Sequence, residues 1–345
     1  MYLNSVEKNP VTLWDDAKRQ MIEEVRKWPY DFPTSPDFPP ADQRGLVYGQ
    51  LRINDRFMKD VNKEASNAFV GLAAPGEAGS WQVESKGYQF WVQASDDGYF
   101  IIKNVRPGTY NLYAWVPGYL GDYVYAQNIT ITPGENMNLK VLTLQPPRYG
   151  PTLWEIGVPD RTAAEFFVPD PNPTLANGLY NRFKDQKFRQ YGLWERYTDL
   201  YPNEDLTFTA DLSVYQTDWF FAHVTRKIAD GRYQATTWKI LFNLKNVQAN
   251  AIYVLRIALA SATNSELQVR VNDPNGSPDF TSGLIGRDNA IARHGIHGLY
   301  RLFRIDILGD KLVKGENTIF LTQARSDGPF SGIMYDYIRL EGPPM

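Results

Sequence analysis

Cysteine is absent from this chain of 345 residues, and histidine occurs only three times. The lack of cysteine excludes disulfides, thiol nucleophiles and cysteine-held zinc or iron–sulfur sites. The chain has no excess of positive charge, because it contains 36 Lys and Arg and 39 Asp and Glu. We therefore expect no nucleic-acid partner. The most apolar stretch, residues 251–262, is interrupted by Arg256 and is too short to span a bilayer. Residues 1–7 lack the basic and apolar regions of a signal peptide, so we expect a soluble chain without a membrane partner.

Aromatic and turn-forming residues are abundant instead. The chain has 9 Trp, 21 Tyr and 18 Phe, together with 26 Gly and 23 Pro. Aromatic side chains favour strands, whereas glycine and proline favour turns, so the composition predicts an all-β protein. At roughly 150 residues per domain, the length predicts about two domains.

The first 44 residues predict one helix and a linker. Apolar side chains recur at steps of three and four over residues 11–28, which is the period of an amphipathic helix. Thr12 is a suitable N-cap, and Pro29 ends the pattern. Further prolines follow up to residue 40, and they favour an extended chain.

Residues 45–147 predict a first sandwich of short strands. The dipeptides Asp97-Gly98 and Pro133-Gly134 separate stretches of alternating apolar and polar residues, as in β-hairpins. About 100 residues with this strand spacing fit a seven-stranded unit that is fibronectin-III-like or prealbumin-like.

Residues 148–345 predict a second, larger sandwich. Apolar and polar residues alternate strictly over 267–272, so that strand has one buried and one solvated face. Eight or more antiparallel strands without long helices predict a jelly-roll sandwich.

Catalytic motifs do not stand out in the sequence. Phosphate loops, dinucleotide fingerprints, nucleophile elbows and zincin motifs are all absent. His294 and His297 lie three residues apart between glycines, and this spacing fixes no third metal ligand. Hydrogen bonding within the loop, contact with a ligand through His294, and metal or acid–base chemistry all stay open.

The segment 188–197 combines aromatic and guanidinium side chains around a glycine. Flat rings suit the C–H face of a sugar, and arginine suits hydroxyls or a uronate carboxylate. Arg189, Tyr191 and Trp194 are therefore candidate carbohydrate-binding residues. The alternative is that Tyr191 and Trp194 pack in a core or between domains.

A second candidate segment, 218–226, has the period of a strand. Trp219 and His223 then share one face, which indicates core burial for the aromatic residues. We expect His223 and Arg226 to be the exposed contacts, and we add Trp219 as a candidate for carbohydrate binding.

Several blocks of sequence resemble one known family, the rhamnogalacturonan endolyases of the plant type. The blocks cover nearly the whole chain in order: 13–18, 28–33, 42–45, 104–110, 153–157, 159–163, 189–194, 218–223 and 334–340. The resemblance implies a fibronectin-III-like domain followed by a jelly roll similar to carbohydrate-binding modules. It also implies that residues 1–4 are the closing strand of a preceding catalytic domain. The catalytic Lys and His of the family lie in that domain, so no catalytic residue is carried over.

The resemblance implies an accessory, carbohydrate-binding part of an enzyme that cleaves pectin by β-elimination. The expected partner is a pectic polysaccharide, rhamnogalacturonan I, bound by a monomer in the extracellular space or the cell wall, with no cofactor. One alternative is an active lyase that uses His294 or His223 as the base and Arg293 or Arg226 against the carboxylate. Another is a scaffold that binds no sugar.

Overall fold

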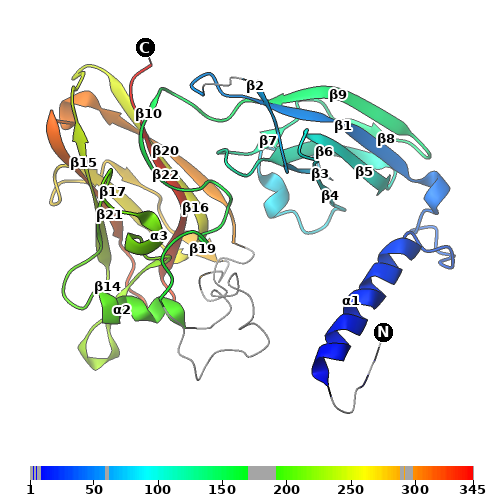
Figure 1. Cartoon of the computed structure of the whole chain (residues 1–345), viewed down its shortest axis with the longest axis horizontal. Helices are drawn as coiled ribbons and strands as arrows, with labels where there is room; N and C mark the ends of the chain where they lie inside the picture. Colours follow the sequence, from blue (N-terminus) through cyan, green and yellow to red (C-terminus); the bar gives the residue numbers. More distant parts are fainter. Residues whose placement is uncertain are drawn as a thin grey trace. The chain divides into compact units, whose positions relative to one another are not determined.

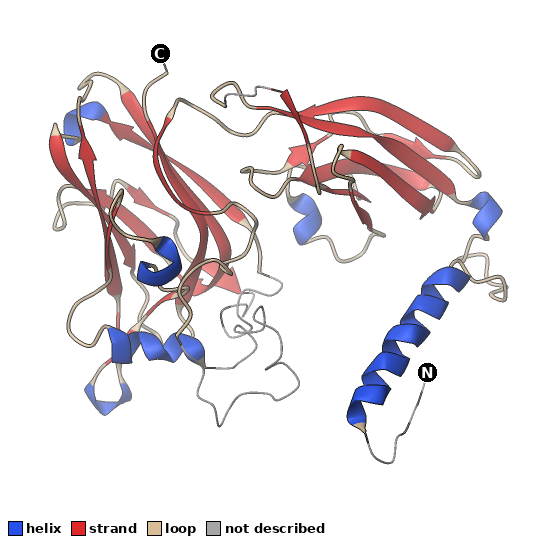
Figure 2. Ribbon diagram, in the orientation of Figure 1, coloured by secondary structure: helices blue, strands red, loops and turns tan. Residues whose placement is uncertain are grey.

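The chain folds into two compact units that consist mainly of β-strands (Figure 2). The structure, a computed structural model, describes residues 3, 5, 9–58, 62–169, 192–287, 291 and 298–344. The first unit comprises Met1–Arg52, Glu64–Ala114 and Tyr123–Leu144; the second comprises Ile53–Lys63, Trp115–Asp122 and Gln145–Met345. Two short segments that the sequence assigned to the first domain, 53–63 and 115–122, thus pack with the second unit.

The N-terminal helix α1 spans Pro10–Lys27 (Figure 1). Asn9 is its N-cap and accepts a hydrogen bond from the backbone N–H of Val11 at 3.1 Å. The prediction that Thr12 is the N-cap is wrong, because Pro10 already begins the helix and the Thr12 hydroxyl donates to the Asn9 carbonyl. Proline suits this first turn, where its missing N–H would have no partner within the helix.

Two sheets make up most of the first unit. One contains β1 (Gly45–Asn54), β2 (Asn62–Glu64), β5 (Tyr99–Val105) and β9 (Asn136–Leu144). The other contains β3 (Phe69–Ala73), β4 (Phe90–Gln93), β6 (Gly108–Trp115), β7 (Tyr123–Val124) and β8 (Ile129–Ile131). The last two residues of β1 and the first two of β2 belong to the segment 53–63 of the second unit. Short 3-10 helices cover Ala41–Gln43 and Ser80–Gln82. Along β5, Phe100 and Ile102 are buried whereas Tyr99 and Ile101 are exposed, as the period of a half-buried strand requires.

A six-stranded sheet and a five-stranded sheet form the second unit (Figure 1). The six-stranded sheet has the order β10 (Thr152–Gly157), β22 (Gly332–Glu341), β16 (Ile252–Ser265), β19 (Ile285–Arg287), with β12 (His223–Val224) on β22 and β20 (Arg301–Leu308) on β16. The five-stranded sheet has the order β11 (Thr207–Thr209), β15 (Thr236–Leu244), β21 (Gly315–Gln323), β17 (Leu267–Val271), β18 (Phe280–Thr281). A small hairpin joins β13 (Arg226–Lys227) to β14 (Tyr233–Gln234).

Short helical turns connect these strands. They are η4 (Leu193–Arg196), α2 (Tyr197–Leu200), α3 (Tyr215–Asp218), η5 (Ala229–Gly231) and η6 (Gly309–Lys311). The all-β class predicted from composition is confirmed, with one difference in detail: β11 pairs with β15 in parallel, not antiparallel. The predicted strand over 218–226 is also wrong, because α3 ends at Asp218 and only His223–Val224 and Arg226–Lys227 form strands.

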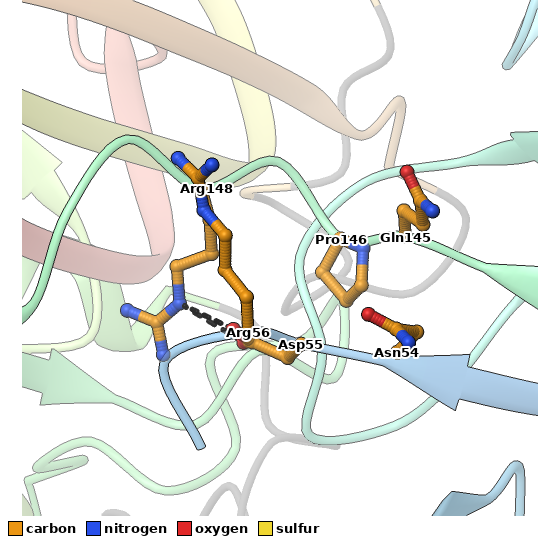
Figure 3. A pocket seen from close by; sticks show the side chains of 6 residues that line it. All are labelled: Asn54, Asp55, Arg56, Gln145, Pro146 and Arg148. Carbon is orange, nitrogen blue, oxygen red and sulfur yellow. Dashed lines mark hydrogen bonds and ion pairs between the residues drawn. The ribbon is translucent and has the colours of Figure 1, made fainter. Parts of the chain in front are cut away.

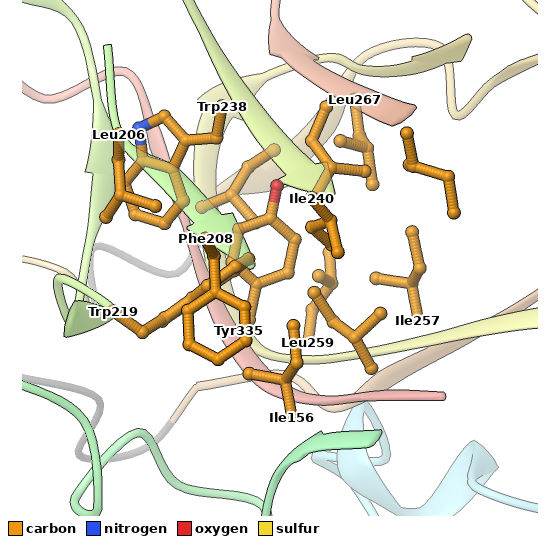
Figure 4. Close-up of a cluster of buried hydrophobic side chains, with 14 of the residues drawn as sticks. Ile156, Leu206, Phe208, Trp219, Trp238, Ile240, Ile257, Leu259, Leu267 and Tyr335 are labelled. Carbon is orange, nitrogen blue, oxygen red and sulfur yellow. The ribbon is translucent and has the colours of Figure 1, made fainter. Parts of the chain in front are cut away.

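The core of the second unit fills the space between its two sheets (Figure 4). Along β15, Trp238 and Ile240 are fully buried, and they face Ile257 and Leu259 of β16 across the sandwich. Each such aliphatic side chain contributes roughly 1.5–3 kcal/mol of transfer free energy. In the five-stranded sheet, the alternation of apolar and polar residues along β15, β17 and β21 thus fixes which face is turned outward.

Candidate functional site

The candidate carbohydrate-binding residues predicted from the sequence fall into two groups. Arg189, Tyr191 and His294 lie outside the described residues, as do Arg293 and His297. Trp194, Trp219, His223 and Arg226 belong to the second unit, where all four are buried. A buried side chain offers no surface to a polysaccharide. The packing alternative therefore accounts for Trp194 and Trp219, and the expected exposure of His223 and Arg226 is not found.

His223 is fully buried and connects the two sheets. It lies in β12, on the edge of the six-stranded sheet, and its Nε2 lies 3.2 Å from the carbonyl oxygen of Thr236 in the five-stranded sheet. A carbonyl can only accept, so Nε2 carries the proton and Nδ1 accepts from the Tyr335 hydroxyl at 2.9 Å. The imidazole stacks on Trp238 with ring centroids 4.2 Å apart.

Burial lowers the pKa of His223 to about 3, although its hydrogen bond to Thr236 acts in the opposite direction. The imidazole is therefore neutral, with both nitrogens occupied by protein partners. The prediction that His223 is exposed is wrong, and a neutral ring without access to solvent is unsuited to act as the base of a lyase.

Arg226 is also internal, with only 6% of its surface exposed. Its Nε donates to the Tyr201 carbonyl at 2.7 Å, and its guanidinium pairs with Asp205. Asp205 in turn accepts from the Tyr197 hydroxyl and from the backbone N–H of Thr237. The expected exposure of Arg226 is therefore wrong, because this arginine joins β13 to the loop before β11, and Asp205 of that loop contacts β15.

Trp194 and Trp219 are core residues. Trp194 in η4 is 1% exposed, and its indole N–H donates to the Pro329 carbonyl at 3.0 Å. Trp219 has no exposed surface and lies edge-on to Trp238 with ring centroids 5.1 Å apart. Both rings serve to close the sandwich, and neither presents a face to a sugar.

A small polar pocket of 270 Å³ is lined by six residues of the second unit (Figure 3): Asn54, Asp55, Arg56, Gln145, Pro146 and Arg148. Its two buried charges satisfy each other, because Arg148 Nε lies 2.9 Å from the nearer carboxylate oxygen of Asp55. Arg148 also donates to the Thr152 hydroxyl at 2.6 Å. The contacts of Arg148 with Asp55 and Thr152 therefore fix the chain before β10. The pocket itself is smaller than most ligand sites.

The outer face of the six-stranded sheet carries a row of arginines. Arg339, Arg256 and Arg304 stand side by side on β22, β16 and β20. Glu341 is fully buried among them: it pairs with Arg256 at 2.9 Å and with Arg339, and it accepts the backbone N–H of Tyr149 at 2.8 Å. The charges of Arg256 and Arg339 are thus neutralised by Glu341 and covered by residues 147–149, whereas Arg304 is exposed and pairs with Asp306.

The segment 115–122 covers another part of the same face. Arg161 lies over the rings of Trp115 and Tyr300, at 4.7 and 4.3 Å from their centroids, and pairs with Asp122 at 2.8 Å. Leu120 is buried against Ala258 and two tyrosines. This outer face is therefore an internal packing surface.

The outer face of the five-stranded sheet is different, because it is open. The register places Phe320 of β21 between Lys239 of β15 and Arg270 of β17. Lys239 is exposed, and Phe320 and Arg270 are half-buried. We call Lys239, Phe320 and Arg270 the central row.

Threonines and an amide surround the central row. These flanking residues are Thr207, Thr237, Thr318, Thr322 and Gln268. Sequence reasoning recognised the wet face of 267–272 but did not combine it with the alternation in β15 and β21. The central row is therefore the candidate binding surface that the sequence-based prediction missed.

Neither a metal centre nor a membrane span is found in the part of the chain that the structure describes. No three acidic or histidine side chains there converge as metal ligands. No described helix combines the length and the apolar character that crossing a bilayer requires.

Family models identify both units. Residues 152–340 match the model described as polysaccharide lyase family 4, domain III, and residues 65–139 match the one described as polysaccharide lyase family 4, domain II. The chain belongs to polysaccharide lyase family 4. The two models, a CBM-like domain and a fibronectin-III-type domain, follow the order of the two predicted sandwiches, so the expected fold class is confirmed.

Curated relatives agree with this family. The rhamnogalacturonate lyase of Dickeya dadantii (strain 3937) is 29% identical over 350 residues, which cover 100% of this chain and 51% of the relative. A probable rhamnogalacturonate lyase B of Aspergillus flavus is 24% identical over 338 residues, with 88% and 48% covered. The resemblance to the C-terminal domains of rhamnogalacturonan lyases is confirmed. These relatives are bacterial and fungal, so a plant-type origin stays a prediction.

The polysaccharide lyase family 4 chain spans about half the length of the curated relatives that it matches. Among solved structures, a family 35 carbohydrate binding module from an environmental isolate is 21% identical and has a TM-score of 0.22, with 34% of this chain and 72% of that chain covered.

Proposed function

We propose that this chain is the accessory, carbohydrate-binding part of a rhamnogalacturonan lyase. The observation that carries the proposal is the match of residues 152–340 to the CBM-like domain III of polysaccharide lyase family 4. The proposed ligand is a pectic polysaccharide, rhamnogalacturonan I, whose backbone the whole enzyme would cleave by β-elimination. In this proposal, residues 148–345 hold the glycan, residues 45–147 form the preceding fibronectin-III-like domain, and residues 1–44 contain the helix and linker.

The open face of the five-stranded sheet supports this function better than the buried residues do. A glycan needs an accessible surface with a flat apolar group and several hydrogen-bonding groups. Phe320 and the threonines around it have these properties, whereas Trp219 and His223 are enclosed. We further propose that the chain acts as a monomer outside the cell, where pectic polysaccharides occur.

Binding of rhamnogalacturonan I fragments to the intact chain tests the proposal. Isothermal titration calorimetry should show saturable binding, with a neutral glucan of similar length as the control. Absence of binding to every pectic fragment would contradict the carbohydrate-binding role.

A second assay addresses the lyase alternative. β-Elimination next to galacturonate creates an unsaturated uronate, which absorbs ultraviolet light. We expect a flat absorbance trace when the purified chain is mixed with rhamnogalacturonan I. A rising trace would favour an active lyase over an accessory domain.

A further inference from the structure

The three side chains of the central row are held on one face by strict alternation. Trp238 and Ile240 flank Lys239 in β15 and point into the core; Ile319 and Leu321 flank Phe320, and Val269 and Val271 flank Arg270, in the same way. Successive side chains of a strand point to opposite faces. The central row therefore points outward from one of the best-buried parts of the sandwich, and its position is set by a rigid sheet.

The guanidinium of Arg270 is oriented by its own neighbours. Its Nε donates to the Gly276 carbonyl at 2.8 Å, and one terminal nitrogen donates to the Gln268 side chain at 3.0 Å. These contacts restrict the rotamers of the side chain and leave its charge without an acidic partner among the described residues. Part of the entropy that arginine loses on binding a carboxylate is thus already lost.

Lys239 provides the second positive charge on the other side of the ring. Its ammonium forms no ion pair with any residue that the structure describes. Two acidic residues lie near this row without pairing with it. Glu316 is four positions from Phe320 along β21, about 13 Å at the rise of a strand, and Asp279, which accepts the backbone N–H of Val271, is paired with Lys311. Glu266 precedes β17 and accepts hydrogen bonds from Gln268 and Thr281. The middle of the face is therefore positive.

The distance across the central row corresponds to a short piece of polysaccharide. Lys239 and Arg270 lie on strands separated by β21, so their backbones are about 9.5 Å apart at two strand spacings. This is close to the length of a disaccharide. A chain that crosses the strands, and in which an acidic sugar alternates with a neutral one, would bring one carboxylate to each cation and a neutral ring to Phe320.

We propose that the outer face of the five-stranded sheet binds an acidic polysaccharide with alternating uronate residues, through Phe320 stacked on a neutral sugar and Lys239 and Arg270 paired with the carboxylates on either side. This inference rests on the proposed carbohydrate-binding function and adds the site and the side chains that would recognise the acidic ligand. Charge complementarity commits the face to an anionic glycan, because a neutral glycan would leave both cations without partners.

The test compares variants of the intact chain in binding to rhamnogalacturonan I and to the same polysaccharide after chemical reduction of its carboxyl groups. We expect wild type to bind the acidic form at least about tenfold more tightly than the reduced form, since hydrogen bonds to charged groups are the strong ones. Phe320→Ala should weaken binding of the acidic form about tenfold or more. The double variant Lys239→Gln/Arg270→Gln should do the same and should also lower the salt dependence of binding.

Matched controls lie elsewhere on the same unit. Lys227→Gln removes an exposed lysine from β13, and Phe330→Ala removes a ring that is 44% exposed outside the sheet. Both should bind as wild type does. Unfolding midpoints of all variants separate loss of binding from loss of fold. If Phe320→Ala lowers the midpoint, Lys239→Gln alone, which removes an exposed charge and leaves the ring in place, provides the test of binding.

The outcomes distinguish the site from the function. If wild type binds rhamnogalacturonan I and the central-row variants bind it equally well, the site is wrong and the carbohydrate-binding function stands. If wild type binds the reduced polysaccharide as tightly as the acidic one, the proposal that the ligand is acidic is wrong. If wild type binds no form of the polysaccharide, the proposed function fails, and this inference fails with it.

Discussion

The two sheets of the second unit share one core, but their outer faces are opposite in character. On the six-stranded sheet, Arg256 and Arg339 are nearly buried and share the carboxylate of Glu341. On the five-stranded sheet, Lys239 and Arg270 flank Phe320, and no described acidic side chain pairs with them. Both outer faces carry Lys or Arg side chains. Only the structure shows that those of the six-stranded sheet already pair with an acidic residue of the protein.

The difference teaches how to read an arginine or an aromatic residue in a β-rich sequence. A buried cation with a buried carboxylate stabilises the packing of the chain and is unavailable to a ligand. A cation on an open sheet face, next to a half-buried ring, contributes little to folding and can be used for binding. Mutations on the two faces should therefore separate stability from glycan binding.

Trp194→Ala should have the largest effect, and it should act on stability. The indole is 1% exposed and donates a hydrogen bond to the Pro329 carbonyl, so its removal leaves both a cavity and an unpaired carbonyl. We expect a loss of about 3–5 kcal/mol in the free energy of unfolding. Urea unfolding followed by tryptophan fluorescence measures it. A stable variant with weakened glycan binding would contradict the structure and restore Trp194 as a binding residue.

Glu341→Gln should have the next largest effect. The substitution keeps the shape of the side chain but leaves Arg256 and Arg339 buried without their counter-charge. We expect a loss of about 3 kcal/mol in the free energy of unfolding, measured with urea. Glu316→Gln on the five-stranded sheet is the matched control and should change it by less than about 0.5 kcal/mol. Equal effects of the two variants would break the comparison of the two faces.

Much of the fold followed from patterns that local physics determines. The strict alternation in 267–272 predicted β17 and its open face, and the period of residues 11–28 predicted α1 within one residue at each end. Alternation cannot say which strands become neighbours, because pairing depends on contacts far apart in sequence. Lys239, Phe320 and Arg270 are 31 to 81 positions apart, so the central row becomes visible only through strand pairing.

The expected exposure of His223 and Arg226 was wrong for a related reason. A cluster of aromatic and arginine residues satisfies the requirements of a sugar site and those of a core with a buried ion pair equally well. Trp219 and Arg226 belong to the second kind, since the chain at 219–222 is buried on both sides and lacks the alternation of a surface strand. Exposure separates the two interpretations, and exposure depends on the tertiary structure.

His223 in the core between the two sheets should make the stability of the chain depend on pH. The pKa of His223 is lowered to about 3 in the folded chain, against about 6.5 for an unperturbed histidine. Between about pH 6.5 and pH 3 the unfolded chain therefore binds one proton that the folded chain does not, and stability falls as the pH falls through this range. The contribution reaches about 1.4 kcal/mol per pH unit between the two pKa values.

His223→Gln isolates this contribution from the titration of acidic residues. The variant should be less stable than wild type near neutral pH, because it loses the stacking on Trp238. The gap in the free energy of unfolding should then narrow as the pH is lowered from about 7 to about 4. Urea titrations at several pH values measure the gap. Parallel curves for the two proteins would mean that His223 is accessible to protons in the folded state.

Lys239→Gln should have the smallest effect on stability, and this small effect is the sharpest test of the comparison. Its ammonium is exposed and makes no described ion pair, so we expect a change below about 0.5 kcal/mol in the free energy of unfolding. Arg256→Gln is the matched substitution on the six-stranded sheet and should be far more destabilising, because it leaves the buried carboxylate of Glu341 with one cation fewer. If Lys239→Gln were as destabilising as Arg256→Gln, the positive charge on the open face would serve the fold, and the five-stranded sheet would have no free cation to offer a uronate.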